Sequence, residues 1–177
     1  GLKWKQGYTD QRITEKGKVL DTYPIYKYEF LKDTGVTVSV SIRDREVKCK
    51  VWLCDEFGNA PLYLLDTDVP GNEDGWICGQ LYGWFGEERI AQEMVLGIGG
   101  VKALRALGIK TDVYHFNEGH ALFAGFELMR EKLEADKTYD EAFAATRNEI
   151  VFTTHTPVVQ GNESHYISRL LYMGADN

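Results

Sequence analysis

The sequence predicts an α/β fold, with an antiparallel β-rich first half and a strand–helix–helix–strand second half. Two observations carry this prediction. Apolar and polar residues alternate in residues 36–42 and 47–53, which is typical of strands that bury one face. From residue 87 onward, apolar residues recur instead at the spacing of a helix. With 177 residues and a hydrophobic fraction of 44%, the chain has room for one sizeable core or two small ones.

The first segment, residues 1–69, is predicted to consist of hairpins. The stretches VTVSVSI (36–42) and VKCKVWL (47–53) flank the charged sequence RDRE, a pattern that predicts an antiparallel hairpin. Another strand is expected at 62–69, after the turn sequence DEFGNAP. Residues 70–86 are rich in glycine and aromatic residues. We expect them to form a long functional loop, whose rings either stack on a sugar or fill the core.

The second segment, residues 87–177, is predicted to contain two parallel strands joined by helices. VYHF and IVFTT read as the strands, and the helices between them require a crossover that leaves the strands parallel. Gly108 is suited to end the helix that precedes the first strand, and Thr138 and Glu141 form a capping box. The helices are expected at 87–107, 119–134 and 138–148.

Composition excludes several classes of function. The net charge of −7 argues against a nucleic-acid partner, which needs clustered basic residues. No apolar run approaches the roughly 20 residues that span a bilayer, and no secretory signal is visible, so we expect a cytoplasmic protein without a membrane partner. The three cysteines are too few and too oddly spaced for a zinc knuckle or a disulfide framework. The chain opens on Gly1 in what looks like mid-domain sequence, so we expect a piece of a longer protein.

Polar residues follow each of the two predicted parallel strands. NEGH (117–120) comes after the first strand, and TTHTP (153–157) ends the second. In open parallel sheets, ligands bind outside the carboxyl ends of the strands, so we expect both groups at one crevice. The alternative is that these residues only cap a helix and fill a loop.

Each residue of the first group has an expected local task. Asn117 is suited to cap the following helix, and Gly119 would let the backbone turn sharply into it. Glu118 would accept a hydrogen bond from a histidine and thereby fix its tautomer.

Other motifs lack the secondary-structure context that their usual function requires. GIGG (97–100) lies inside a helical pattern, whereas a dinucleotide fingerprint follows a strand, so we expect these glycines to permit close helix packing. His115 and His120 are five residues apart across a strand–helix junction, which breaks the metalloprotease pattern, and we expect no metal. No serine, cysteine or lysine stands in a recognisable nucleophile motif.

These motifs together resemble the α-glucan (glycogen and maltodextrin) phosphorylases, specifically their shorter bacterial and archaeal branch. VYHFNEGHALF (113–123) and VFTTHTPV (151–158) carry the resemblance. GLKWKQGYTDQRI, YLLDTDVP, GQLYG and ERIAQEMVLGIGGVKALRALGI match the same family in the same order. The likeness therefore extends over nearly the whole chain, to about residue 162.

The resemblance implies a fragment of the N-terminal domain of a GT-B enzyme, in which two Rossmann-like domains face each other across a cleft. The chain would be one incomplete domain of a two-domain enzyme, with 87–177 as its Rossmann-like segment. Such enzymes transfer glucosyl units between the end of an α-1,4-glucan and orthophosphate, giving glucose 1-phosphate with retained configuration. Their cofactor is pyridoxal phosphate, which acts through its phosphate. The lysine that anchors it belongs to the C-terminal domain, so we expect no cofactor-binding residue here.

The resemblance also implies roles for single residues. His155 matches a cleft histidine that contacts the glucosyl hydroxymethyl group and stabilises positive charge at the sugar through its backbone carbonyl. Glu118 matches an acidic residue that supports this histidine, and we expect both to be catalytic. Asn117, His120 and Thr154 are expected to contact the substrate.

Three functions are compatible with these motifs. The first is a phosphorylase fragment, inactive alone, with the glucan, orthophosphate or glucose 1-phosphate as ligands, the C-terminal domain of the same chain as partner, and self-association through uncovered apolar surface. The second is a GT-B glycogen or starch synthase-like transferase that uses a nucleotide sugar. The third is a non-catalytic glucan-binding or structural fragment. NEGH and TTHTP favour the first.

Overall fold

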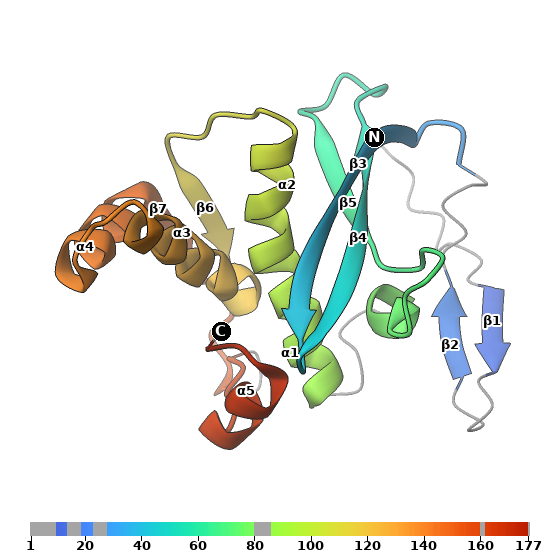
Figure 1. The fold of residues 1–177 in the computed structure, drawn as a ribbon. Helices are drawn as coiled ribbons and strands as arrows, with labels where there is room; N and C mark the ends of the chain where they lie inside the picture. The colour runs from blue at the N-terminus through green and yellow to red at the C-terminus, as the bar shows by residue number, and fades with distance from the viewer. Residues whose placement is uncertain (1–9, 14–18, 23–27, 80–85, 160–161, 177) are drawn as a thin grey trace.

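The structure, a computed structural model, describes residues 10–13, 19–22, 28–79, 86–159 and 162–176. Within these residues the strands form two antiparallel sheets and one parallel sheet, and helices pack beside them (Figure 1). The mixed α/β class is thus confirmed, with the antiparallel strands in the first half of the chain and the parallel strands in the second.

The antiparallel strands come first along the chain. Strands β1 (Asp10–Ile13) and β2 (Val19–Thr22) pair with each other, and β3 (Lys32–Ile42), β4 (Arg45–Cys54) and β5 (Leu62–Asp66) form a sheet in that order. The β3–β4 hairpin is the one that the alternating pattern predicts. It closes with Arg43 and Asp44 at φ 52° and 57°, the left-handed pair that a tight two-residue turn requires.

A continuous helical column follows the antiparallel sheet. It consists of α1 (Glu87–Met94), the π-helical segment η3 (Val95–Gly99) and α2 (Gly100–Ala106), which confirms the helix expected over 87–107. The column ends where predicted, because Gly108 adopts φ +69° and the amide of Ile109 bonds back to the carbonyl of Leu104. Figure 1 shows the column standing between the β3–β4 hairpin and the parallel unit.

The parallel unit forms the other side of the molecule. Its elements are β6 (Tyr114–Asn117), the 3-10 turn η4 (Gly119–Ala121), α3 (Leu122–Glu134), α4 (Tyr139–Glu149) and β7 (Ile150–Thr153). Strands β6 and β7 are direct neighbours in parallel register, with Asn117 opposite Thr153. Both hydrogen bonds of the predicted capping box, between Thr138 and Glu141, are present at the start of α4. A last helix, α5 (Ile167–Met173), follows β7.

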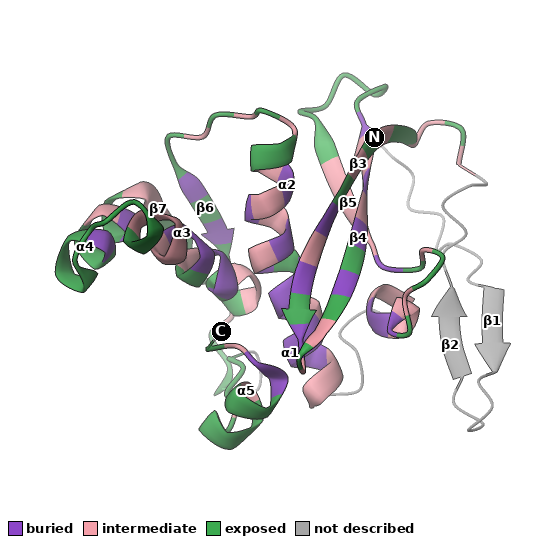
Figure 2. Cartoon of the chain, in the orientation of Figure 1, coloured by how far each residue is buried: buried purple, intermediate pink, exposed green. Residues whose placement is uncertain are grey.

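Two clusters of buried side chains fix the column between its neighbours. The larger lies between the β3–β4 hairpin and the column, and Val40, Cys49, Ile90 and Met94 in it are fully buried. The smaller joins α2 to β6 and α3 around Leu128. Figure 2 shows the buried positions on the facing sides of these elements, whereas the outer turns of α4 are exposed.

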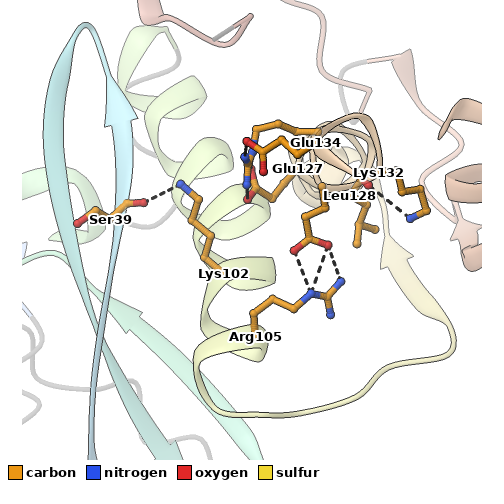
Figure 3. A network of polar contacts seen from close by, with 9 residues as sticks. Ser39, Lys102, Arg105, Glu127, Leu128, Lys132 and Glu134 are labelled. Carbon is orange, nitrogen blue, oxygen red and sulfur yellow. Dashed lines mark hydrogen bonds and ion pairs between the residues drawn. The ribbon is translucent and has the colours of Figure 1, made fainter. Parts of the chain in front are cut away.

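Polar contacts add to the packing of the column on its neighbours (Figure 3). The ammonium group of Lys102 on α2 donates to the carbonyl of Ser39 on β3, at 3.0 Å. On the opposite side, Arg105 bonds both carboxylate oxygens of Glu131 on α3, with distances of 2.8–3.3 Å. The column is therefore tied to both layers.

The loop expected at 70–86 contains a short helical turn, η2 (Gly75–Gly79). Ile77 is fully buried, and the Trp76 ring packs against the larger core while its indole N–H donates to Asp74. Of the two readings of these aromatic residues, Trp76 thus favours the core. Residues 80–85 lie outside the described part of the chain. Among the described residues, every helix is too short or too polar to cross a lipid bilayer.

Gly97 is where the column comes closest to α3. A Cβ atom there would lie 2.5 Å from the backbone nitrogen of Ala124 and 2.8 Å from atoms of Phe123. Gly97→Ala should therefore lower the free energy of unfolding by about 2 kcal/mol or more, through overpacking. Gly100→Ala, three residues further on and with nothing within 4 Å of the added atom, is the control and should stabilise by about 0.5 kcal/mol. Urea denaturation measures both, and equal effects of the two substitutions would contradict the packing role of Gly97.

Candidate functional site

The candidate site begins where β6 and β7 end. The amide of Glu118 donates to the carbonyl of Thr153 at 2.8 Å, which continues the ladder between the strands by one residue. Glu118 then turns the chain, with φ 62° and ψ −170°. The expectation that Gly119 supplies this turn is wrong, because the left-handed conformation, which favours glycine, is adopted by Glu118 itself.

The carboxylate of Glu118 organises the segment after β7. It is buried, with 7% of the residue exposed, and accepts hydrogen bonds from four donors. The donors are the His155 amide (2.9 Å), the Thr156 amide (3.0 Å), the Thr156 hydroxyl (2.8 Å) and the Thr154 hydroxyl (3.1 Å). The His155 amide first, and then the Thr156 hydroxyl, lower the pKa of Glu118 to about 2. Glu118 is therefore ionised at neutral pH and fixes the backbone of 154–156.

His155 lies in front of this carboxylate with its ring 61% exposed. Its Nε2 is 2.9 Å from Oδ1 of Asn117, and its Nδ1 is 3.4 Å from Glu118 Oε1. Asn117 was expected to cap the helix after β6, and this is wrong: Glu118 precedes η4, Ala121 precedes α3, and neither side chain caps. The Asn117 amide instead orients the His155 ring, because the ring lies within its reach across the parallel pair.

The structure thus brings together four of the predicted site residues, namely Asn117, Glu118, Thr154 and His155. Glu118 accepts from the backbone amide of His155 and only approaches its ring, so the expected hydrogen bond that would fix the tautomer of this histidine is not formed. The fifth residue, His120, lies in η4, two residues after Glu118, and belongs to a second polar cluster.

This second cluster joins three parts of the chain. Nη2 of Arg89 on α1 is 2.7 Å from Nδ1 of His120, and Nε of Arg89 donates to Glu163 at 2.7 Å. One α-helical turn after Arg89, a carboxyl oxygen of Glu93 lies 3.0 Å from Nε2 of His165, within hydrogen-bonding distance. No sequence motif indicated a site role for four residues of this cluster, namely Arg89, Glu93, Glu163 and His165. Only the spacing of Arg89 and Glu93, four residues apart on a helix, was visible in the sequence.

A cavity of about 360 Å³ is lined by the second cluster and by Glu118, whereas Asn117, Thr154 and His155 are not among the described residues that line it. Its polar lining includes Glu93, Glu118, His120 and Glu163, and its apolar lining includes Phe123 and Phe152. A ligand in this cavity would meet hydrogen-bonding groups on one side and rings on the other, which is the mixed lining typical of small-molecule sites.

The second cluster has the ligand types of a metal site but not its arrangement. One ligand atom each of Glu93, His120 and Glu163 lies within 4.8 Å of the others. The guanidinium of Arg89, however, stands between His120 and Glu163 and bonds both. Since Arg89 keeps its positive charge at any relevant pH, it takes the place that a cation would occupy.

Several named proteins are similar in sequence to this chain. No family model matches it. It is 39% identical over 180 residues to the maltodextrin phosphorylase of Thermococcus litoralis, a match that covers 96% of this chain and 22% of that protein. The glycogen phosphorylases of Mycobacterium tuberculosis (39% identity) and Aquifex aeolicus (34%) match 91% and 89% of this chain and 20% and 24% of their own length. The chain is homologous to one segment of the glycogen and maltodextrin phosphorylases.

The phosphorylase resemblance inferred from the motifs is thereby confirmed. The chain spans about a fifth of the length of the phosphorylases named above. The match to the maltodextrin phosphorylase covers nearly all of this chain.

Glu93 makes the stability of this chain depend on pH. Burial first, and then the hydrogen bond with Glu163, raise the pKa of Glu93 from its ordinary 4.5 to about 9. Between these values the folded state holds a proton that the unfolded chain has lost, so the free energy of unfolding falls as pH rises. Glu93→Gln should remove at least about 1 kcal/mol of this decline, since one pKa unit corresponds to about 1.4 kcal/mol.

Urea denaturation at about pH 5 and about pH 8 measures this effect of Glu93. Glu131→Gln, which alters a carboxylate on the opposite side of α3, is the control and should keep the wild-type decline. A Glu93→Gln variant that declines as steeply as the wild type would show that Glu93 does not hold the proton.

Proposed function

We propose that the chain is part of an α-glucan phosphorylase, which transfers glucosyl units between the end of an α-1,4-glucan and orthophosphate to give glucose 1-phosphate. The observation that carries this proposal is the convergence of Glu118 and His155 at the ends of two adjacent parallel strands, beside a cavity. The homologous proteins are named maltodextrin phosphorylase and glycogen phosphorylase, which supports the same reaction.

The proposed roles follow from the charge of the reaction. A glucosyl group in transfer carries oxocarbenium character, and dipoles already aimed at that charge stabilise it without reorganising. The backbone carbonyl of His155 would supply such a dipole, and its ring would bond a sugar hydroxyl. Glu118 holds this backbone through the amides of His155 and Thr156, and Asn117 orients the ring. Thr154 and His120 would complete the sugar-facing wall.

The wider architecture is also proposed by analogy with the family. Residues 1–69, the loop 70–86 and the segment 87–177 would form one part of the N-terminal domain of a GT-B enzyme, facing a C-terminal domain of the same protein. Pyridoxal phosphate, held in that other domain, would supply the acid–base phosphate. Exposed apolar side chains that line one hollow between α3, α4 and β7 support a covering partner for this face, either the remaining protein or a second copy: Phe126, Phe143 and Phe152.

The test is the product formed by the intact protein that carries this segment. With maltoheptaose and orthophosphate, it should release glucose 1-phosphate, and omission of orthophosphate should abolish the release. Turnover of a nucleotide sugar without orthophosphate dependence would instead identify a synthase-like transferase. Glucan binding without turnover in either assay would identify a non-catalytic module.

A further inference from the structure

The hydrogen bond between Arg89 and His120 determines which ring nitrogen of His120 carries hydrogen. Arginine only donates hydrogen bonds and is not deprotonated in proteins. Its Nη2 lies 2.7 Å from His120 Nδ1. Nδ1 must therefore accept, and the hydrogen of the neutral ring lies on Nε2.

Two acidic side chains, Glu163 and the buried Glu93, hold Arg89 in this position. Its Nε and Nη2 lie 2.7 and 2.6 Å from Glu163 Oε1, and its Nε lies 3.5 Å from Glu93 Oε1. The Arg89 and Glu93 side chains are 9% and 7% exposed. A guanidinium that is itself buried and bonds partners on η4 and before α5 cannot turn without leaving its own charge unpaired, which is costly. The donor to Nδ1 is thus fixed by the fold.

The other nitrogen of His120 remains for a ligand. The ring is a third exposed and lines the cavity beside Glu118. Within the described residues, Nε2 of His120 has no hydrogen-bond partner. An Nε2–H group beside a cavity is a donor suited to a neutral oxygen, such as a sugar hydroxyl.

We propose that Arg89 is a positioning residue for the sugar site: it holds His120 in the tautomer whose Nε2–H donates to a hydroxyl of the glucosyl unit. This inference rests on the proposed phosphorolysis for its substrate, but not for the tautomer. Arg89 acts through His120 and does not itself need to touch the sugar. Its effect on the reaction should therefore vanish when His120 is absent.

A double-mutant cycle in the intact protein tests this dependence. Arg89→Met should lower kcat/KM for phosphorolysis about tenfold to a hundredfold, the effect of one misplaced hydrogen bond of about 1.4 to 2.8 kcal/mol. In a His120→Ala background the same change should have less than about a twofold effect, because the two residues act as one unit. Arg105→Met, which breaks a comparable arginine–carboxylate pair on the far side of the column, should stay within about twofold of wild type in both backgrounds.

The tautomer is measured separately. In protein labelled with ¹⁵N-histidine, the His120 ring, assigned through His120→Gln, should show one unprotonated Nδ1 in the wild type and a mixture of tautomers in Arg89→Met. Additive losses of kcat/KM in the cycle, or an unchanged tautomer in Arg89→Met, would overturn the proposal. If the wild type makes no glucose 1-phosphate, the proposed function fails, and the ring spectrum alone decides whether Arg89 sets the tautomer.

Arg89→Met leaves Glu163 without its main partner, and the variant then risks not folding. Arg89→Lys replaces it in that case, since the ammonium keeps the charge but cannot bond His120 and Glu163 with one planar fork. Its loss of kcat/KM should be smaller, about threefold to tenfold, and should again vanish in the His120→Ala background. A loss that persists there would count against the proposal.

Discussion

Replacing Glu118 by alanine is expected to reduce phosphorolysis at least about a hundredfold, since a displacement of about 1 Å at a reacting group has effects of this size. The carboxylate accepts from both backbone amides and both hydroxyls that shape 154–156. Without it, the His155 carbonyl and ring lose their common support. The loss should appear mainly in kcat, because the dipole is needed most when charge develops on the sugar.

Initial rates of glucose 1-phosphate release by the intact protein measure this effect. Glu131→Ala removes a carboxylate on α3 that bonds Arg105 on α2, and should leave the rate within about threefold of wild type. Glu118→Gln should fall between alanine and wild type, because it keeps one acceptor oxygen but faces amide donors with its own NH₂ group. A Glu118→Ala enzyme with a near-normal rate would remove Glu118 from the site.

The lowered pKa of Glu118 gives this variant a second signature. The folded-state pKa of about 2 lies below the ordinary 4.5, so the carboxylate stabilises the fold above pH 4.5 and loses this contribution as pH falls toward 2. Wild-type protein should therefore lose more stability than Glu118→Gln over this acidic range. Thermal unfolding at several acidic pH values compares the two slopes, and parallel slopes would contradict the hydrogen-bonding account.

Replacing His155 by alanine is the second change with a large expected effect, a loss of about tenfold to a hundredfold in kcat/KM. The ring is exposed at the strand ends and oriented by Asn117, so its removal deletes a direct contact with the sugar and little packing. Thermal stability should therefore change little. The split between a large kinetic effect and a small stability effect distinguishes this variant from Glu118→Ala.

His115→Ala is the matched control for this substitution. His115 lies on β6, the parallel neighbour of the strand that precedes His155, is also exposed, and bonds the Thr153 hydroxyl through Nε2 at 2.6 Å. It faces the cavity between the column and β5 and not the one beside Glu118. If His115→Ala and His155→Ala reduced kcat/KM equally, the position of His155 at the strand end would have no special meaning.

The sequence predicted the frame of the site because the frame depends on local patterns. Period-two alternation located the β3–β4 hairpin, and helical spacing located the column. The crossover of helices implied parallel strands, and parallel strands place their carboxyl ends together, which is why Glu118 and His155 were expected to meet. Of the glycines at 97–100, Gly97 packs closely against α3, whereas Gly99 faces β3 and β5 and Gly100 has nothing within 4 Å of an added Cβ, so the predicted helix packing is confirmed for Gly97.

The details of the site were not predictable from local preference. Asparagine commonly caps helices, but the Asn117 side chain instead bonds the ring of His155, 38 residues away. The tertiary hydrogen bond thus outweighs the local capping preference. Glycine commonly adopts left-handed conformations, yet Glu118 adopts this one and its carboxylate is held by four hydrogen bonds. The second cluster joins Arg89 to Glu163 across 74 residues, and no spacing in a single sequence signals such a pair.

The most direct test of the account is the crystal structure of the intact protein with a bound maltooligosaccharide. The account predicts the terminal glucosyl unit at the carboxyl ends of β6 and β7, with a sugar hydroxyl within about 3 Å of the His155 ring or carbonyl and another near Nε2 of His120. A sugar bound elsewhere, with the ends of β6 and β7 covered by other parts of the protein, would contradict it.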